Sequence, residues 1–338
     1  MASNRILVLN TGSGSISFID PAEISVDGAV EVGADPRDLV EASGRGTVFV
    51  SLAGDGTVAV LDIASRRIVA RTKVGRGPGH IYEHPSGEEI WVANDGSGEL
   101  GVLAAETGDL LATVAAGAGH HKIAFTSDGR WAFATNIADA TVTVVDAVTH
   151  EVAATIPVVR APHGIVVRPD DRYVLVCNNG ADAVSVIGVE ERAVVKEVRG
   201  PERPNYIRLS PDKRSAWIAH KSGTVSRFDL DRMEFDGSLA VGEVPERIAF
   251  ADGGRRIFVN DIQATTLSAI DADGLRVIAE IPVQESGWHQ GMIFGPDSKT
   301  LFAVNHGAGT VSVVDAEENR VIDRLVVGDG PSNIIALG

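Results

Sequence analysis

The sequence is short of cysteine and of long apolar runs, and each shortage excludes a class of protein. The single cysteine, Cys177, excludes an internal disulfide and a CxxCH haem attachment, and its place in the run YVLVC predicts a small buried side chain. No run of 18 apolar residues could span a bilayer, and the start, MASNRILVLN, lacks the basic end and apolar core of a secretory signal. We therefore expect a soluble, cytoplasmic protein with no membrane partner.

Positive charge is also scarce. Lys and Arg number 30 against 46 Asp and Glu, which gives a formal net charge of -16. Binding to a nucleic-acid backbone needs clustered Lys and Arg, so we expect no nucleic-acid partner. The 338 residues are 44% hydrophobic, which is enough for a large core. We expect a monomer whose partner is a small-molecule ligand.

The strongest signal is an internal repeat of about 42 residues. Each copy holds four short runs rich in Val and Ile, bounded by Gly, Pro, Asn and Asp, which is typical of four strands and of a propeller blade. No segment shows sustained helical periodicity. One apolar position marks the copies: Leu39, Ile81, Ile123, Ile165, Ile207, Ile248, Met292 and Ile334.

The number of copies predicts how the fold closes. Seven complete units run from Gly33 to Val327, and the remaining runs are PSNIIAL at the C-terminus and RILVLN, SISFID and AVEV at the N-terminus. Together these four runs supply one more blade, which would cover the sheet edges of the first and last units. We therefore predict an all-β, eight-bladed propeller in a single domain over residues 1–338. Seven blades are the alternative, and they would leave a whole unit of strands unpaired.

Several segments resemble the YVTN-type β-propeller repeat, among them YVLVCNNGADAVSVI, IWVANDGSG and LFAVNHGAGTVSVVDAEENRVI. The likeness extends over essentially the whole chain. The resemblance implies the fold but not one function, because the family includes surface-layer and secreted proteins without catalysis. The fold is also similar to that of lactonases and of the haem-binding propeller of nitrite reductases, so a non-covalent haem-like cofactor is one option that the resemblance implies.

Two histidines break a rule of the repeat. In such propellers the start of each first strand and the turn after each second strand face the same mouth of the channel. The position just before the first strand is proline in six copies and histidine in two, His120 and His289. These two copies are four blades apart, so we predict that the side chains face each other across the channel as catalytic residues on two sides of a bound molecule.

Histidine gathers at this predicted mouth. Imidazole binds zinc, copper, iron and nickel, and it transfers protons near neutral pH. We interpret His80, His121 and His163, on three successive blades, as ligands of one divalent transition metal. Metal-free substrate binding and no small-molecule role are the alternatives, because the sequence has no HExxH or spaced-cysteine motif. Seven of the nine histidines map there: His80, His120, His121, His163, His220, His289 and His306.

Other polar residues map to the same mouth. Positive and aromatic side chains would suit a carboxylate or phosphate on a small ligand, although mutual ion pairing explains the charges equally well. Four carboxylates could act as a general base or as further ligands: Glu246, which we take as the catalytic candidate, and Asp38, Asp95 and Asp261. The Asn residues that end the second strands are interpreted as turn formers. The predicted substrate-binding residues are Arg37, Lys122, Tyr206, Arg247, His220 and His306.

Two functions remain open. The first is an enzyme that uses a metal or histidine for hydrolysis, elimination or isomerisation of a small polar or anionic molecule. The second is a non-catalytic propeller that binds a ligand or protein over its face. A protein-binding platform needs an exposed apolar patch, whereas this mouth is polar and rich in histidine. The composition of the mouth therefore favours the enzyme.

Overall fold

The computed structural model describes residues 5–119, 122–283 and 289–338, with the backbone alone described at residues 289 and 290. Its strands form eight four-stranded sheets in which neighbouring strands run antiparallel. The protein is thus an all-β, eight-bladed propeller, as the repeat predicts. The chain divides into two compact units, the middle unit of residues 34–207 and the terminal unit of residues 1–33 and 208–338.

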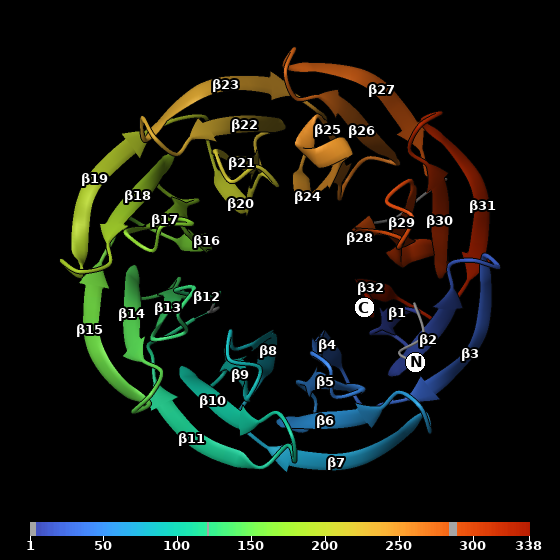
Figure 1. The fold of residues 1–338 in the computed structure, drawn as a ribbon, viewed down its shortest axis with the longest axis horizontal. Coiled ribbons are helices and arrows are strands. Elements are labelled where there is room, and N and C mark those ends of the chain that lie inside the picture. The colour runs from blue at the N-terminus through green and yellow to red at the C-terminus, as the bar shows by residue number, and fades with distance from the viewer. Residues whose placement is uncertain (1–4, 120–121, 284–288) are drawn as a thin grey trace. The chain divides into compact units, whose positions relative to one another are not determined.

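The middle unit contains four complete blades. In Figure 1 their first strands lie on the inner side of the unit and their fourth strands on its outer border. The strands are β4 (Pro36–Ala42), β5 (Thr47–Leu52), β6 (Thr57–Asp62) and β7 (Arg67–Lys73); β8 (Pro78–Glu83), β9 (Glu89–Asn94), β10 (Glu99–Ala104) and β11 (Leu110–Ala115); β12 (Ile123–Phe125), β13 (Trp131–Asn136), β14 (Thr141–Asp146) and β15 (Glu151–Pro157); β16 (Pro162–Val167), β17 (Tyr173–Asn178), β18 (Ala183–Gly188) and β19 (Ala193–Arg199).

The terminal unit carries the other blades, and β20 spans the boundary between the units. The strands are β1 (Ile6–Asn10), β2 (Ser15–Asp20), β3 (Ser25–Glu31) and β32 (Pro331–Ala336); β20 (Pro204–Leu209), β21 (Ser215–His220), β22 (Thr224–Asp229) and β23 (Glu234–Ala240); β24 (Pro245–Ala251), β25 (Arg256–Asp261), β26 (Thr266–Asp271) and β27 (Arg276–Pro282); β28 (His289–Phe294), β29 (Thr300–Asn305), β30 (Thr310–Asp315) and β31 (Arg320–Val326).

Both ends of the chain share one blade. Its strand order is β3-β2-β1-β32, and β1 pairs with β32 so that Ile6 lies opposite Ala336 and Val8 opposite Ile334. Ile6, Val8 and Ile334 belong to one buried apolar cluster. The predicted closure of a blade by the N- and C-terminal strands is therefore confirmed.

The burial of the strands follows their place in the blade. The second strand β5 and the third strand β6 are near-continuous apolar runs with buried interiors, as expected for strands that are covered on both faces. The fourth strand β7 instead alternates exposed and half-buried residues.

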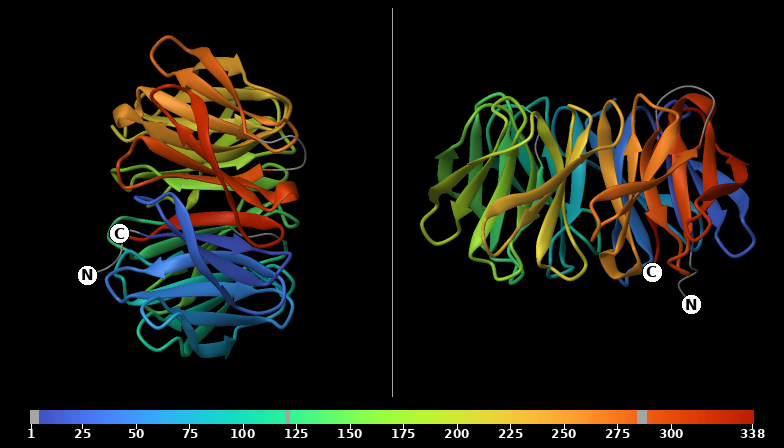
Figure 2. Two further views of the ribbon diagram at one scale, coloured as in Figure 1. Left: turned by 90° about the vertical axis from the view of Figure 1, so that its right-hand side faces the viewer. Right: turned by 90° about the horizontal axis from the view of Figure 1, so that it is seen from above.

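Each blade also has a register shift between its third and fourth strands, and its sheet is twisted (Figure 2). Cys177 in β17 is fully buried, which confirms that prediction and raises the pKa of its thiol.

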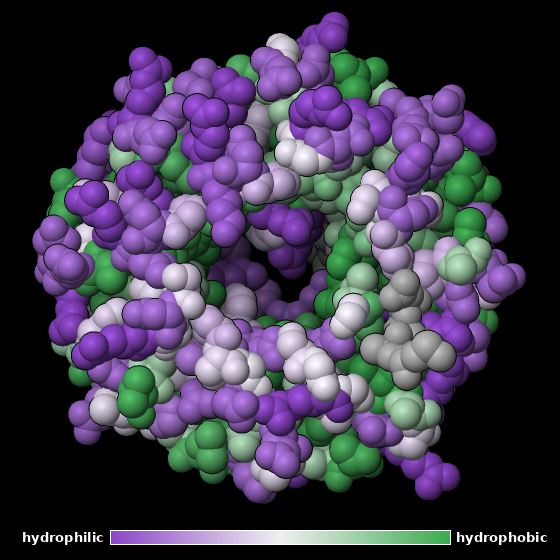
Figure 3. All heavy atoms as spheres, in the orientation of Figure 1, coloured by the Kyte–Doolittle hydropathy of each residue, from purple (hydrophilic) through white to green (hydrophobic). Residues whose placement is uncertain are grey.

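The described helices are two single 3-10 turns, η1 (Asp252–Gly254) and η2 (His306–Ala308), and within the described residues no helix is long and apolar enough to cross a membrane. On the face drawn in Figure 3, hydrophilic residues cover most of the surface and hydrophobic residues form small separate patches. Exposed large apolar residues such as Val69 and Val148 are scattered over different blades. Scattered apolar residues of this kind are normal for a protein surface.

Candidate functional site

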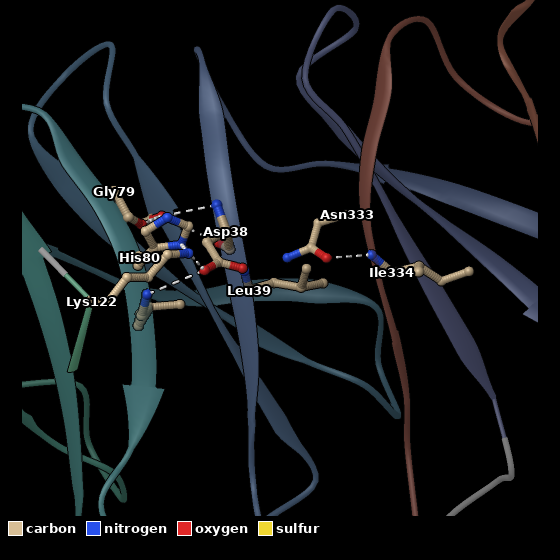
Figure 4. A network of polar contacts seen from close by, with 9 residues as sticks. Asp38, Leu39, Gly79, His80, Lys122, Asn333 and Ile334 are labelled. Atoms are coloured by element: carbon tan, nitrogen blue, oxygen red, sulfur yellow. Dashed lines mark hydrogen bonds and ion pairs between the residues drawn. The ribbon is translucent and has the colours of Figure 1, made fainter. Parts of the chain in front are cut away.

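Three successive blades of the middle unit bring Asp38, His80 and Lys122 together (Figure 4). Asp38 lies in β4, His80 in β8, and Lys122 directly before β12. The His80 Nδ1 atom lies 2.9 Å from Asp38 Oδ2 and 3.3 Å from Lys122 Nζ. The side chains of His80 and Asp38 are only 20% and 13% exposed. We call these three residues the rim cluster.

The rim cluster depends on an irregularity in the first strand. The pairing of β4 with β5 shifts register between Pro36 and Asp38. The Ser51 hydroxyl accepts a hydrogen bond from the Asp38 N–H at 3.0 Å and donates one to the Gly79 carbonyl of the next blade at 2.6 Å. Ser51 therefore links the backbone of Asp38 to the residue that precedes His80.

A second hydroxyl repeats this link two blades further on. Thr135 Oγ1 accepts from the Lys122 N–H at 3.0 Å and donates to the His163 carbonyl at 3.2 Å. Ser51 and Thr135 are not among the site residues predicted from the sequence. A signal for both exists, because the same position of the repeat is apolar in the adjoining copies, at Leu9, Ala93 and Cys177.

Electrostatics fix the protonation of the cluster. Burial raises the pKa of Asp38, but the hydrogen bond and charge of His80, the Lys122 ammonium and the Leu39 N–H lower it by more, so the pKa lies below its usual value. Asp38 is therefore ionised near neutral pH. An ionised carboxylate only accepts hydrogen bonds, so we assign the His80 proton to Nδ1. Lys122 then acts on this pair as a positive charge, and the lone pair of neutral His80 lies on Nε2.

His163 has the same tautomer for a similar reason. Its Nδ1 atom lies 3.0 Å from the Asn205 carbonyl oxygen, which only accepts, so Nδ1 carries the proton. The third predicted metal ligand, His121, lies outside the described residues. Among the residues that the structure describes, no group of three or more His, Cys, Asp or Glu could hold a metal ion. The set of His80, His121 and His163 stays a prediction.

Other predicted site residues also fall outside the described part. These are His120 and the side chain of His289, whose backbone begins β28 opposite Asn305. The predicted opposition of His120 and His289 across the channel is therefore still a prediction.

The remaining charged and aromatic candidates have local contacts of their own. Arg37 is exposed and forms an ion pair with Asp35 at 3.0 Å, which agrees with the alternative of mutual ion pairing. Glu246 and Arg247 are half-buried in β24, and the Arg247 N–H donates to Asn260 Oδ1 at 2.5 Å. Tyr206 is half-buried in β20. Their predicted roles in binding or catalysis stay open.

The residues at the ends of the second strands are interior rather than exposed. Asn10 and Asn136 are fully buried, and each Nδ2 donates at 2.9 Å to a hydroxyl of the third strand, Ser17 and Thr143 respectively. The interpretation of these Asn residues as structural is supported, although they fasten two strands rather than only forming a turn. This position holds a fully buried Asn in five copies: Asn10, Asn94, Asn136, Asn178 and Asn305.

Two ionisable candidates, His220 and Asp261, also end second strands and are buried. His220 is 0% exposed and its Nε2 lies 2.7 Å from Ser226 Oγ. Asp261 is 2% exposed and accepts hydrogen bonds from the N–H groups of Val244 and Gln263, both at 2.9 Å. Neither side chain offers a surface to a ligand, so neither enters the proposal below. His306 is half-buried, with Nδ1 3.1 Å from the Pro331 carbonyl oxygen.

Comparison with known proteins supports the repeat assignment. Residues 121–241 match the family model of YNCE-like beta-propellers. The resemblance to YVTN-type β-propellers is confirmed. Among curated proteins, no sequence matches this propeller.

Three solved structures are similar to this propeller. Dihydro-heme d1 dehydrogenase NirN in complex with DHE has a TM-score of 0.82 at 15% identity, over 98% of this chain and 75% of that chain. Kuenenia stuttgartiensis hydrazine synthase has a TM-score of 0.63 at 19% identity, over 77% of this chain and 92% of that chain. A functionally unknown protein from Desulfotomaculum acetoxidans DSM 771 has a TM-score of 0.68 at 13% identity, over 99% of both chains. At these identities the similarity shows the propeller fold and no function.

Proposed function

We propose that this propeller binds a small anionic molecule at the rim cluster, and that His80 exchanges a proton with it. The observation that carries the proposal is the contact of His80 Nδ1 with Asp38 Oδ2 at 2.9 Å, beside the Lys122 ammonium at 3.3 Å. Asp38 holds the ring in one orientation and one tautomer, as a carboxylate does for a catalytic histidine. The ring then presents Nε2 as the atom that takes up or gives a proton.

The charge of the cluster favours an anion when His80 is protonated. With neutral His80, the Asp38 carboxylate and the Lys122 ammonium cancel, whereas the imidazolium gives the cluster one net positive charge. Binding of a carboxylate or phosphate would therefore be coupled to proton uptake by His80. A group that takes up and returns one proton suits elimination or isomerisation of an anionic substrate. A non-catalytic ligand-binding propeller is the alternative, and it would bind the anion without turnover.

A metal site is the second candidate function, and one observation favours it. His80 and His163 both direct Nδ1 at an oxygen, the Asp38 carboxylate and the Asn205 carbonyl. Metal-binding histidines commonly donate the second ring N–H in this way, which leaves Nε2 to coordinate. With His121 from the blade between them, the set would suit Zn, Cu, Fe or Ni. The Lys122 ammonium beside His80 opposes a cation, so we rank the metal below the anion.

A haem-like cofactor falls within the proposed ligand class because haem carries carboxylate groups. The solved structure with the TM-score of 0.82 is described as a complex with DHE, which is a property of that protein. We also propose that the protein is cytoplasmic and monomeric and that it forms a single domain. Further residues proposed to act on the ligand are His120, His289 and Glu246 in catalysis and Arg37, Tyr206, Arg247 and His306 in binding.

The test is a binding assay with defined probes. Calorimetric titrations with citrate, inorganic phosphate and hemin at pH 6.5 and pH 8.5 give the affinity and its pH dependence. We expect tighter binding of at least one probe at pH 6.5 and a loss of about tenfold or more in His80→Gln and Lys122→Gln, equivalent to about 1.4 kcal/mol. Lys73→Gln is the control, because Lys73 is an exposed cation on β7 of the same unit.

Two results would overturn the anion proposal: wild-type affinity in both rim variants, or binding of no probe by the wild-type protein. Elemental analysis of protein expressed with added Zn, Cu, Fe and Ni tests the second candidate. Bound metal that decreases in His163→Gln but not in Lys122→Gln would favour the metal site instead.

A further inference from the structure

One segment of this acidic chain has the opposite charge. Residues 63–82 contain no Asp or Glu, although the whole chain has 46 of them and a net charge of -16. The segment holds five cationic residues, Arg66, Arg67, Arg71, Lys73 and Arg76. It covers all of β7.

The structure places three of these cations on one exposed face. β7 is the outermost strand of its blade, next to β6 (Figure 1). Residues 67, 69, 71 and 73 are exposed and alternate with half-buried ones. The outward face of β7 therefore presents Arg67, Val69, Arg71 and Lys73 in a row of about 20 Å, at about 3.3 Å per residue. Asp55 lies 3.4 Å from Arg71 and offsets part of its charge.

Protection of the sheet edge does not explain this positive face. Charged side chains and β-bulges both hinder pairing between exposed edges. β7 already has a bulge at Val69, because Val60 pairs with Ala70 and Leu61 with Ile68. Two other outer strands carry negative charge at exposed positions, with Asp27 and Glu31 in β3 and Glu234 and Asp236 in β23. Because charge of either sign protects an edge, edge protection alone does not account for the choice of positive charge in β7.

We infer that the outward face of β7 binds an acidic, extended segment of a partner protein. Carboxylates at every second residue of such a segment would match the spacing of Arg67, Arg71 and Lys73. The bulge at Val69 disfavours continuous backbone pairing, so side-chain charges carry the contact. A narrow segment can follow β7, although the turn that contains Glu106 and Asp109 packs beside the strand, where Thr72 donates a hydrogen bond to the Gly108 carbonyl. Charges more than about 8 Å away are largely screened at physiological salt. A bilayer or a duplex is wide enough to meet the acidic surfaces as well.

The experiment measures binding of a fluorescein-labelled ten-residue peptide with six Glu residues by anisotropy. The R67Q/K73Q variant removes two cations from β7 and leaves Arg71 with its Asp55 partner. The matched control is R320Q/R324Q, which removes two exposed cations from the equivalent strand β31, where Asp323 is also exposed. We expect R67Q/K73Q to bind the peptide about fivefold more weakly than wild type, and R320Q/R324Q to bind it almost as tightly as wild type. Binding should be weaker in 500 mM than in 50 mM NaCl. A peptide with Gln in place of Glu should not bind.

Because β7 contains no residue of the rim cluster, citrate, phosphate and hemin binding should not change in R67Q/K73Q. Three results would overturn the assignment of β7 to an acidic partner segment. The first is equal peptide affinity in the two double variants. The second is binding of the Gln peptide as tight as that of the Glu peptide. The third is tighter, β7-dependent binding of phosphatidylserine vesicles or a DNA duplex, which would assign the face to those partners.

Discussion

Asp38 and Asn333 occupy the same position in two copies of the repeat, one in the middle unit and one in the terminal unit. Each side chain accepts a hydrogen bond from the N–H of the next residue, Leu39 or Ile334, at 2.9 Å (Figure 4). Only Asp38 carries a charge, and the next blade brings His80 to it. The shared position in the repeat thus explains the hydrogen bond from the next N–H. The charge of Asp38 and its contact with His80 are what distinguish this copy.

The largest effect is expected from removing the strand that carries Asn333. Deletion of residues 331–338 takes β32 from the blade that it forms with β1, β2 and β3, and it exposes Ile6 and Val8. We expect the midpoint of thermal unfolding to decrease by about 10 °C or more, because several buried apolar side chains lose their cover. Circular dichroism measures this midpoint, and a variant that lacks only Gly338 is the control. An unchanged midpoint would mean that β32 adds no stability.

The next effect concerns the charge that distinguishes the two copies. Asp38→Asn makes the middle-unit copy like the terminal one, because the amide oxygen still accepts from Leu39 but no longer holds a protonated His80. We expect the affinity for the anionic probe that binds wild-type protein to fall by about tenfold. The free energy of unfolding should change by about 1 kcal/mol or less, since the backbone contact is kept. Asn333→Asp is the matched control and should leave the affinity unchanged.

The pKa of Asp38 predicts a pH effect on stability. Its pKa lies below the usual value, so its contribution to stability is fully present above about pH 3.9 and is lost as the pH falls through the lower folded-state value. Denaturant titrations at pH 7 and pH 3 should show a smaller acid-induced loss of stability in Asp38→Asn than in wild type. Equal losses would mean that the contacts of Asp38 do not stabilise its ionised form.

The smallest effect comes from the two hydroxyls that link neighbouring blades. Thr135→Val leaves the Lys122 N–H without its hydroxyl acceptor and removes the bond to the His163 carbonyl. We expect a loss of about 1 kcal/mol in the free energy of unfolding, measured by chemical denaturation, and recovery in Thr135→Ser, which keeps the hydroxyl. Ser51→Ala should behave like Thr135→Val. Because valine keeps the methyl group and lacks only the hydroxyl, a Thr135→Val variant as stable as wild type would contradict this role of the hydroxyl.

Most of the fold could be predicted from the sequence because a repeat reports the same structure several times. The apolar marks from Leu39 to Ile334 predict the blades, and the leftover runs around Val8 and Ile334 predict the shared terminal blade, which the pairing of these two residues confirms. Edge strands without partners are unfavourable, so the count of strands leaves few ways to complete the last blade.

The site was predicted less well, for physical reasons. Position in the repeat indicates which end of a strand a residue occupies, but not whether its side chain is exposed, so His220 and Asp261 were placed with the rim although both are buried. The contact of His80 with Asp38 depends on the register shift after Pro36 and on the Ser51 hydroxyl. The shift recurs in other copies, after Pro162 and Pro245, but the residues that it brings together differ from copy to copy, so the repeat alone does not predict this contact.

The tautomer of His80 tests the central claim most directly and needs no ligand. Nitrogen-15 NMR of protein labelled at histidine separates a protonated Nδ1 from a protonated Nε2, and the His80 signals are identified by their absence in His80→Gln. We predict that neutral His80 in the wild-type protein carries its proton on Nδ1 and that this preference weakens in Asp38→Asn. A wild-type His80 protonated on Nε2, or one unaffected by Asp38→Asn, would contradict the proposal that Asp38 orients this ring.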